Sequence, residues 1–337
     1  MYGSGADIGP TVLKNPGESR SLPPLPFREG GIWLRVDGQP DLGAPVSLAA
    51  LCAAHPLWAA DVKRLAPWRE VRLGPETGPW AGTWLRAQGA AGQVAVPLFV
   101  VGECDSSLDA AWALAETGAL PLFASVLAVT QRQGRGQMRR AWSSPPGNLY
   151  AALAWPTHQG DLGAMAPVLV GACLAEGLAA LGYPTLVKWP NDLLLHEAKV
   201  AGILLEERAG RTLAGIGINV VAAPDLAALR RDHAVPATTL AANCAPPGLI
   251  TLWAGLVQSV QTCYRQCVTA SGSGKHSPLV VRRLAWLGRE VLVRENETDA
   301  FRAWIVGLAE DGGLRLRRAD GAHGMELTLH SGSISLL

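Results

Sequence analysis

Residues 185–220 read TLVKWPNDLLLHEAKVAGILLEERAGRTLAGIGINV, four apolar stretches separated by short polar breaks. The stretches are Thr185–Trp189, Leu193–Glu197, Val200–Glu206 and Thr212–Val220. Each has the length and the residue types of a β-strand. The breaks are too short for the crossovers that parallel strands require. We therefore predict an antiparallel meander of four strands.

The chain before this meander shows a regular alternation of short apolar strands and helices. A helix is predicted at Ser107–Glu116, with Ser106 or Ser107 as its N-cap. The apolar stretch Met165–Leu181 carries Glu176 and is followed by Gly and Pro, which predicts a buried core helix and not a membrane span. The strands predicted in this part of the chain are Val96–Val101, Ser125–Thr130 and Asn148–Trp155.

The two ends of the chain differ from this middle part. Residues 1–28 include Ser-Leu-Pro-Pro-Leu-Pro and predict a disordered or extended lead, with no signal peptide. Residues 29–95 are an N-terminal extension of unknown fold, because prolines interrupt any long helix there and only Ile32–Val36 and Glu70–Leu73 resemble strands. After a catalytic domain at 96–270 and a Gly/Ser-rich linker, a small all-β domain is predicted at 279–337. Its predicted short strands are Glu290–Val293, Ala300–Gly307, Leu314–Arg317 and Glu326–Leu329.

Composition limits the class of protein. The 337 residues are 49% hydrophobic and 17% charged, with a net charge of +1, so the chain is globular and has no basic field for unspecific nucleic-acid binding. The six cysteines form no Cys-x-x-Cys pair, which favours reduced thiols in a cytoplasmic protein. Cys263 and Cys267 are four residues apart, and this spacing predicts a core stripe on one helix face.

The first segment that suggests chemistry is a Gly/Arg loop at residues 131–142. Gly134 and Gly136 let backbone amides approach a polyanion, and Arg135 between them can bind phosphate oxygens as a fork. Trp142 offers a flat apolar face for a purine. A solvated turn is the alternative for this segment alone.

Two further segments lie in the meander. Lys188-Trp189-Pro190-Asn191-Asp192 puts a carboxylate at a tight turn, and the hairpin returns Lys199 and Gly202 to the same neighbourhood. Nucleotidyl transfer needs such positioned positive charge and a metal. For each residue by itself there is a simpler interpretation: Asp192 as an aspartate that stabilises its turn, and Lys199 as a solvated lysine of the hairpin. The stretch Gly272–His276 lacks the upstream Gly and the Ser/Thr of a phosphate loop.

The order of these segments resembles the bacterial biotin protein ligases, of the biotin/lipoate protein ligase superfamily, from about Pro97 to the end of the chain. The resemblance lies in Asp105-Ser106-Ser107, the Gln131–Trp142 loop, Asn148-Leu149-Tyr150, the Lys188–Asp192 and Lys199–Glu206 segments and Gly215–Asn219. It implies an α+β fold, with a largely antiparallel mixed sheet, helices packed on one face, and a small C-terminal β-barrel.

The resemblance also implies the activity. An enzyme of this family activates biotin with ATP to biotinyl-5'-AMP plus pyrophosphate, then transfers biotin to a lysine of a carrier. The implied partner is a biotin carboxyl carrier protein or domain, of the acetyl-CoA or pyruvate carboxylase type, and Mg²⁺ is the implied metal. A homodimer is a further expectation that the residues leave open. No DNA and no membrane partner is expected.

The site roles follow position by position from the same resemblance. Asp192 would orient Mg²⁺ or the incoming lysine, and it is grouped with Lys199 and Arg135 as catalytic. The residues expected to bind biotin are Ser106, Ser107, Gln131, Gly134, Arg135, Gly136, Lys199 and Gly202. The residues expected to bind ATP are Arg135, Arg140, Trp142, Asn219 and Lys199.

The sequence departs from the family pattern at the loop and at one helix. Gln137 and Arg139 stand where the family has Arg and Gly, and Leu108 stands where Asn is usual. These departures bear on how firmly the adenylate is held. Two alternatives are a lipoate ligase and a non-catalytic biotin-binding or regulatory relative. The helix-turn-helix repressor unit of some family members is not expected in residues 1–95, which are too rich in Pro and Gly.

Overall fold

The computed structural model describes residues 26–38, 42–117, 120–137, 140–157, 161–224, 235–270, 278–295, 299–319 and 324–337. Most of the expected lead at 1–28, the linker residues 271–277 and Arg139 lie outside these ranges.

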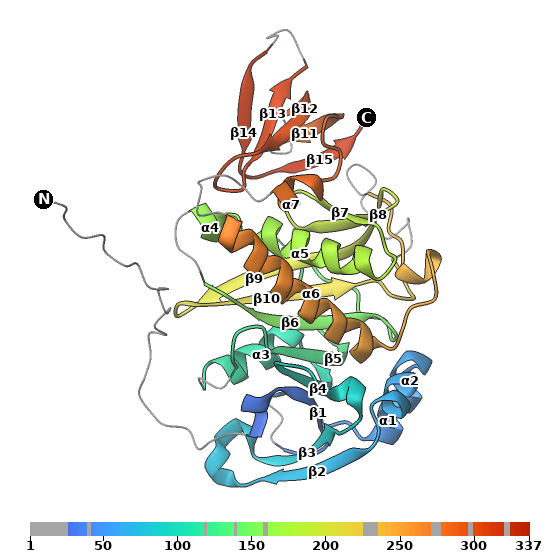
Figure 1. The fold of residues 1–337 in the computed structure, drawn as a ribbon. Coiled ribbons are helices and arrows are strands. Elements are labelled where there is room, and N and C mark those ends of the chain that lie inside the picture. The colour runs from blue at the N-terminus through green and yellow to red at the C-terminus, as the bar shows by residue number, and fades with distance from the viewer. Residues whose placement is uncertain are drawn as a thin grey trace, which may run out of the picture.

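A ten-stranded sheet forms the centre of the molecule (Figure 1), and its hydrogen-bonded order is β2-β3-β1-β4-β5-β6-β10-β9-β8-β7. The strands are β1 (Gly31–Arg35), β2 (Trp68–Leu73), β3 (Gly82–Ala87), β4 (Pro97–Cys104), β5 (Ser125–Gln131), β6 (Leu149–Trp155), β7 (Thr185–Lys188), β8 (Asp192–Leu195), β9 (Ala198–Arg208) and β10 (Arg211–Ile218). The pairs β1–β4 and β4–β5 are parallel, and the other pairs are antiparallel. The predicted mixed, largely antiparallel sheet and the meander β7–β10 are confirmed.

The two faces of the sheet pack against different helices. On β6, Leu149, Ala151 and Leu153 join the core built by α5 (Ala166–Ala180) and α6 (Leu249–Ala270). The alternate residues face the core of α3 (Ser107–Ala115), as the two-residue period of a strand requires. The long helices therefore cover one face as predicted, whereas α3 lies on the opposite face.

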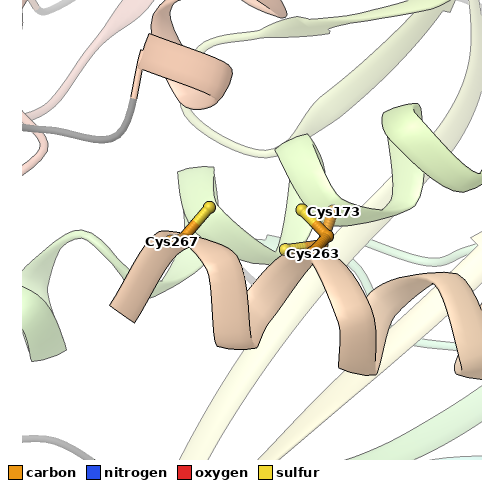
Figure 2. Close-up of side chains that lie close together, drawn as sticks. All are labelled: Cys173, Cys263 and Cys267. Atoms are coloured by element: carbon orange, nitrogen blue, oxygen red, sulfur yellow. The ribbon is translucent and has the colours of Figure 1, made fainter. Parts of the chain in front are cut away.

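Three cysteines lie between the two long helices (Figure 2). Cys173 on α5 and Cys263 and Cys267 on α6 are buried, and their sulfur atoms lie within 4.8 Å of one another. Burial raises the pKa of the Cys173 thiol well above its usual value, so it stays protonated at neutral pH. A structural zinc site normally has four ligands, and among the described residues this group has three. We interpret the cluster as close helix packing with small apolar side chains.

Residues 29–95, whose fold the sequence did not predict, extend the large sheet. Strand β1 pairs with β4 across the expected boundary at residue 96, and β2 and β3 continue the sheet outward. Two helices, α1 (Leu48–Ala54) and α2 (Pro56–Arg64), pack at its side. The carboxylate of Asp61 accepts hydrogen bonds from the backbone of Ile250 and Thr251 at the start of α6. The boundary at 96 is therefore no break in the sheet.

Short helical elements complete this part of the chain. They are the 3-10 helices η1 (Pro26–Glu29), η3 (Pro75–Trp80), η4 (Ala90–Gly92) and η7 (Leu240–Ala242) and the α-helix α4 (Asp161–Ala164). No helix in the described ranges is both long and apolar enough to cross a membrane.

The C-terminal residues form a five-stranded antiparallel sheet after α7 (Pro278–Arg282), in the order β14-β13-β12-β11-β15. Its strands are β11 (Glu290–Arg294), β12 (Ala300–Leu308), β13 (Leu314–Arg318), β14 (Glu326–Leu329) and β15 (Ser333–Leu336). The first four match the predicted strands, and β15 was not predicted. The Trp189 indole N–H donates to the Gly312 carbonyl at 3.0 Å, which ties this sheet to the β7–β8 turn.

Candidate functional site

A cavity of about 960 Å³ lies on the α3 side of the large sheet, between the Gly/Arg loop and the C-terminal sheet. The predicted site residues that line it are Ser106, Ser107, Gln131, Arg135, Gly136, Arg140, Trp142, Asp192, Lys199 and Gly202. Segments that are far apart in the sequence therefore meet in one place. Gly134 and Asn219 do not line it.

One end of the cavity is formed by the start of α3. The Ser106 hydroxyl accepts from the Leu108 backbone N–H and caps the helix, as predicted. The Gln131 side chain accepts from the Ser107 backbone N–H at 2.8 Å and donates to the Ser144 hydroxyl at 3.0 Å. Gln131 therefore fixes the helix start and the loop end together, and its contact with a ligand stays a prediction.

The described parts of the Gly/Arg loop, residues 131–137 and 140–142, pair with each other as a narrow hairpin that lines the cavity. The Trp142 N–H donates to the Gly134 carbonyl at 2.8 Å, and the Gly136 N–H donates to the Arg140 carbonyl at 2.7 Å. A side chain at Gly134 would lie 2.6 Å from the Trp142 carbonyl, so this position needs glycine.

Two glycines of the sheet make room for the Trp142 indole. Gly202 of β9 and Gly217 of β10 lie directly opposite each other across the ladder. A Cβ atom at Gly217 would lie 2.4 Å from the indole, and one at Gly202 would lie 2.7 Å from it. We call these two positions the glycine seat. The Lys199 ammonium lies 5.5 Å from the centre of the ring, a cation–π contact.

A carboxylate with two ammonium groups lies beside this seat. Lys199 Nζ is 2.6 Å from Asp192 Oδ1, and Lys188 Nζ is 3.5 Å from Asp192 Oδ2. Burial lowers the pKa of Lys188, and the positive charges of Lys199 and Arg140 lower it further against the opposing effect of Asp192. Lys188, Lys199 and Arg140 together carry more positive charge than Asp192 carries negative charge, and this balance suits a polyanionic ligand.

Arg135 lies away from these charges. Its Nη1 donates to both oxygens of Asp109 at 2.8 Å, and its Nη2 donates to Glu206 at 3.2 Å. Burial opposes the charged form, but the hydrogen bonds and charges of Asp109 and Glu206 outweigh it, so the pKa of Arg135 is raised. The expected phosphate fork is thus paired with protein carboxylates.

Asn219 follows β10 and is buried. Its backbone N–H donates to Val200, and its carbonyl accepts from Leu240. Behind it, the Asn148 amide oxygen accepts from three successive backbone N–H groups, those of Val220, Val221 and Ala222. Asn148, quoted in the sequence only as part of a motif, thus shapes the segment that carries Asn219.

Several residues of the site were not predicted. Lys188 was quoted only as part of its motif, although a lysine before a Trp-Pro-Asn-Asp turn was a usable signal. The sequence does not indicate that Asp109 and Glu206 belong to the site, because their partner Arg135 is far away along the chain. The C-terminal sheet contributes Arg294, Glu295, Ser331, Gly332 and Ser333 to the cavity.

A magnesium ion is compatible with the residues present. Mg²⁺ is typically bound through one or two carboxylates together with substrate phosphates. Asp192 supplies a carboxylate at the positively charged end of the cavity, next to Lys188 and Lys199. The donor set therefore fits an ion that arrives with a nucleotide.

Two family models match the chain. Residues 120–222 match the Biotin/lipoate A/B protein ligase family, and residues 286–337 match the Biotin protein ligase C terminal domain. The first match contains the Gly/Arg loop, Asp192 and Lys199, and the second contains the cavity residues of the C-terminal sheet.

Curated relatives and solved structures agree with these models. The chain is 41% identical to the Bifunctional ligase/repressor BirA of Escherichia coli over 102 residues, 28% of this chain and 32% of that protein. It is 39% identical to a Biotin--[acetyl-CoA-carboxylase] ligase of Paracoccus denitrificans over 120 residues, 33% of this chain and 50% of that protein. The matches thus span from about a third to a half of these two relatives. A biotin protein ligase from Aquifex aeolicus, solved with biotin and ATP, has the same fold with TM-score 0.56 and 24% identity, over 71% of this chain and 97% of that one.

Proposed function

We propose, because the chain belongs to the biotin protein ligase family, that it is an ATP-dependent biotin–[carboxyl carrier protein] ligase. The observation that carries the proposal is the group formed by Asp192, Lys188 and Lys199 beside the indole on the glycine seat. It combines positive charge for a triphosphate with an aromatic face for a purine. The Aquifex relative, which was solved with biotin and ATP, supports the same pair of substrates.

In the first step, a carboxylate oxygen of biotin attacks the α-phosphorus of ATP. The bond from that phosphorus to the bridging oxygen breaks, and pyrophosphate leaves with the electron pair. Lys199 and Lys188 balance the charge that builds on the phosphate oxygens. Magnesium, when bound at Asp192, would neutralise the leaving pyrophosphate. Trp142 would lie against the adenine and help to exclude water from the mixed anhydride.

In the second step, the neutral amine of a carrier lysine attacks the acyl carbon of biotinyl-5'-AMP. The bond from that carbon to the phosphate oxygen breaks, AMP leaves with the electron pair, and the nitrogen loses a proton to solvent as the amide forms. Asp192 can accept a hydrogen bond from the incoming amine and orient it. The α3 end of the cavity, with Ser106, Ser107 and Gln131, would hold the biotin rings through its polar side chains. The carrier is a biotin carboxyl carrier protein or domain, as the activity of the Paracoccus relative suggests. The free cysteines fit a cytoplasmic enzyme.

The test is biotin-dependent exchange of labelled pyrophosphate into ATP. Wild type should catalyse the exchange with biotin and not with lipoate. Lys199→Ala should reduce it by about 10²–10³-fold, the usual effect of losing one well-placed charge donor, while the melting temperature changes little. Lys63→Ala, on α2 and outside the cavity, is the matched control. Exchange with lipoate would favour the lipoate ligase, and no exchange together with tight biotin binding would favour the non-catalytic relative.

A further inference from the structure

Arg135 and Arg140 of the Gly/Arg loop lie in different surroundings, although the family resemblance implies ATP binding for both. Arg135 is paired with Glu206, which follows Lys199 by seven positions on the extended strand β9. At about 3.3 Å per residue, their Cα atoms are at most about 23 Å apart, and a register shift near Lys199 shortens this distance. The Arg135 guanidinium therefore binds toward the Glu206 end of β9, in the lining of the same cavity as Lys199 and Asp192. Arg140, in contrast, is close enough to Lys188 to act on its charge.

The Arg135 charge is already balanced by the protein. Asp109 binds it through both carboxylate oxygens, and Glu206 forms a second ion pair with it, while Arg208 balances the charge of Glu206. Both terminal nitrogens of this guanidinium already donate to protein carboxylates. A phosphate would have to displace these carboxylates in order to bind Arg135.

Both acidic partners stand on fixed elements. Asp109 lies in the first turn of α3, next to the Ser106 cap. Glu206 also accepts from the Trp112 indole N–H and from Arg208, each at 2.8 Å. The carboxylates are therefore held in place before Arg135 binds them, and the arginine ties the loop to α3 and to β9 at once.

The backbone carries this anchoring to the rest of the loop. Arg135 and Ala141 form an isolated β-bridge, and the neighbouring hydrogen bond joins Gly136 to the carbonyl of Arg140. Because the two sides of the hairpin are joined in this way, fixing Arg135 holds both of them. The second side carries Arg140, which lines the cavity, and continues to the indole of Trp142.

We propose that Arg135 is a positioning residue, which fastens the hairpin through Asp109 and Glu206, and that Arg140 is the arginine of this loop that meets the phosphates. The second half rests on the proposed function, and the first half does not. This division differs from the expectation that Arg135 binds the phosphates itself, and the experiments below decide between the two.

The first experiment uses the full chain without substrates, so it does not depend on any activity. Trypsin cleavage between residues 132 and 140 reports how firmly the hairpin is held. Asp109→Asn keeps every cleavage site and should speed cleavage there by about two- to tenfold, the range expected for a coupled, partly buried ion pair. Asp109→Glu should restore resistance. Arg72→Gln, which breaks the exposed Arg72–Glu70 ion pair on β2 and touches neither the hairpin nor its partners, should cleave like wild type. Equal cleavage of Asp109→Asn and wild type overturns the anchoring.

The second experiment separates the two arginines by pyrophosphate–ATP exchange. Arg140→Gln should raise the KM for ATP by about 10–100-fold, because it removes a charged hydrogen-bond donor. Arg135→Gln and the double variant with Asp109→Asn should share one smaller defect, and Asp109→Asn alone should show at most that defect, since Glu206 still binds Arg135. An Arg135→Gln KM that rises as much as that of Arg140→Gln, or a double variant in which the two defects multiply, overturns the division of roles. If wild type itself shows no exchange, the proposed function fails, and the trypsin result still decides the anchoring.

Discussion

The glycine seat allows a prediction whose size follows from the geometry. In Gly217→Ala the new Cβ would lie 2.4 Å from Trp142 Cε2 and 2.6 Å from Cζ2 and Nε1. Carbon atoms pack best at about 3.5–4.0 Å, so the ring must move back by about 1 Å. Strand β10 cannot yield instead, because it is paired with β6 on one side and β9 on the other.

Forcing a methyl group into a filled space costs about 1–3 kcal/mol. If the indole on its seat forms the adenine surface, the KM for ATP in the exchange assay should rise by about 5–150-fold. Gly202→Ala should act in the same direction and more weakly, because its new Cβ has a single close ring contact, at 2.7 Å.

Gly255→Ala is the matched control. Gly255 lies in α6, and a Cβ atom added there would have no neighbouring atom within 4 Å. Alanine there should leave the KM unchanged and raise the stability by up to about 1 kcal/mol, since glycine is a poor helix former. If both seat variants keep a wild-type KM for ATP, nucleotide binding does not use the seated indole, and the role given to Trp142 is wrong.

The remaining predictions concern stability and the departures from the family. Asp61→Ala leaves buried donors at the start of α6 without an acceptor and should lower the free energy of unfolding by at least about 2 kcal/mol in urea titrations; a smaller loss contradicts the capping role. Hydrogen bonds and charges of Arg283 and Arg282 lower the pKa of Glu176 in the folded protein. The ion pair therefore contributes to the free energy of unfolding above pH 4.5, and this contribution is lost as the pH falls through the folded pKa. Glu176→Gln should lower the melting temperature at pH 7 by an amount worth about 1 kcal/mol, and the difference from wild type should vanish toward pH 3. Gln137→Arg should slow release of biotinyl-5'-AMP by about 10–100-fold, measured as less labelling of bystander albumin, and equal labelling would make this departure silent. Fluorescence anisotropy with the protein's own promoter fragment should detect no sequence-specific binding at sub-micromolar concentrations, with or without biotin and ATP.

The parts of the fold that the sequence predicted are those fixed by local patterns. The meander followed from apolar runs and short breaks, and the start of α3 followed from a serine that can cap its own helix. Strand β15 was missed because the stretch Ser333–Leu336 is short and only half apolar.

Residues 29–95 could not be predicted because their structure depends on partners elsewhere. Strand β1 gains its parallel neighbour only from β4, and Asp61 finds its hydrogen-bond donors at Ile250 and Thr251. A local pattern contains neither partner.

The candidate site divides in the same way. Residue types that recur at fixed spacing, such as Asp192 and Lys199, were found and lie 2.6 Å apart. The carboxylates that pair with Arg135 could not be predicted, since they are 26 and 71 residues away along the chain. A charged side chain can be located from a motif, but its counter-ion depends on the tertiary fold.

The cap that Asp61 provides for α6 also bears on how the chain acquires its structure during synthesis. The acceptor and its donor at Ile250 are separated by 189 residues, so the acceptor leaves the ribosome long before the helix that it caps. Contacts between residues so far apart in the sequence form slowly, because the chain loses the entropy of closing a long loop before it gains the energy of the contact. Until α6 emerges, the apolar face of the sheet that it covers stays open to water and to chaperones. Productive folding of this chain therefore waits for α6, and a chain stalled before residue 249 would have only α5 to cover this face of the sheet.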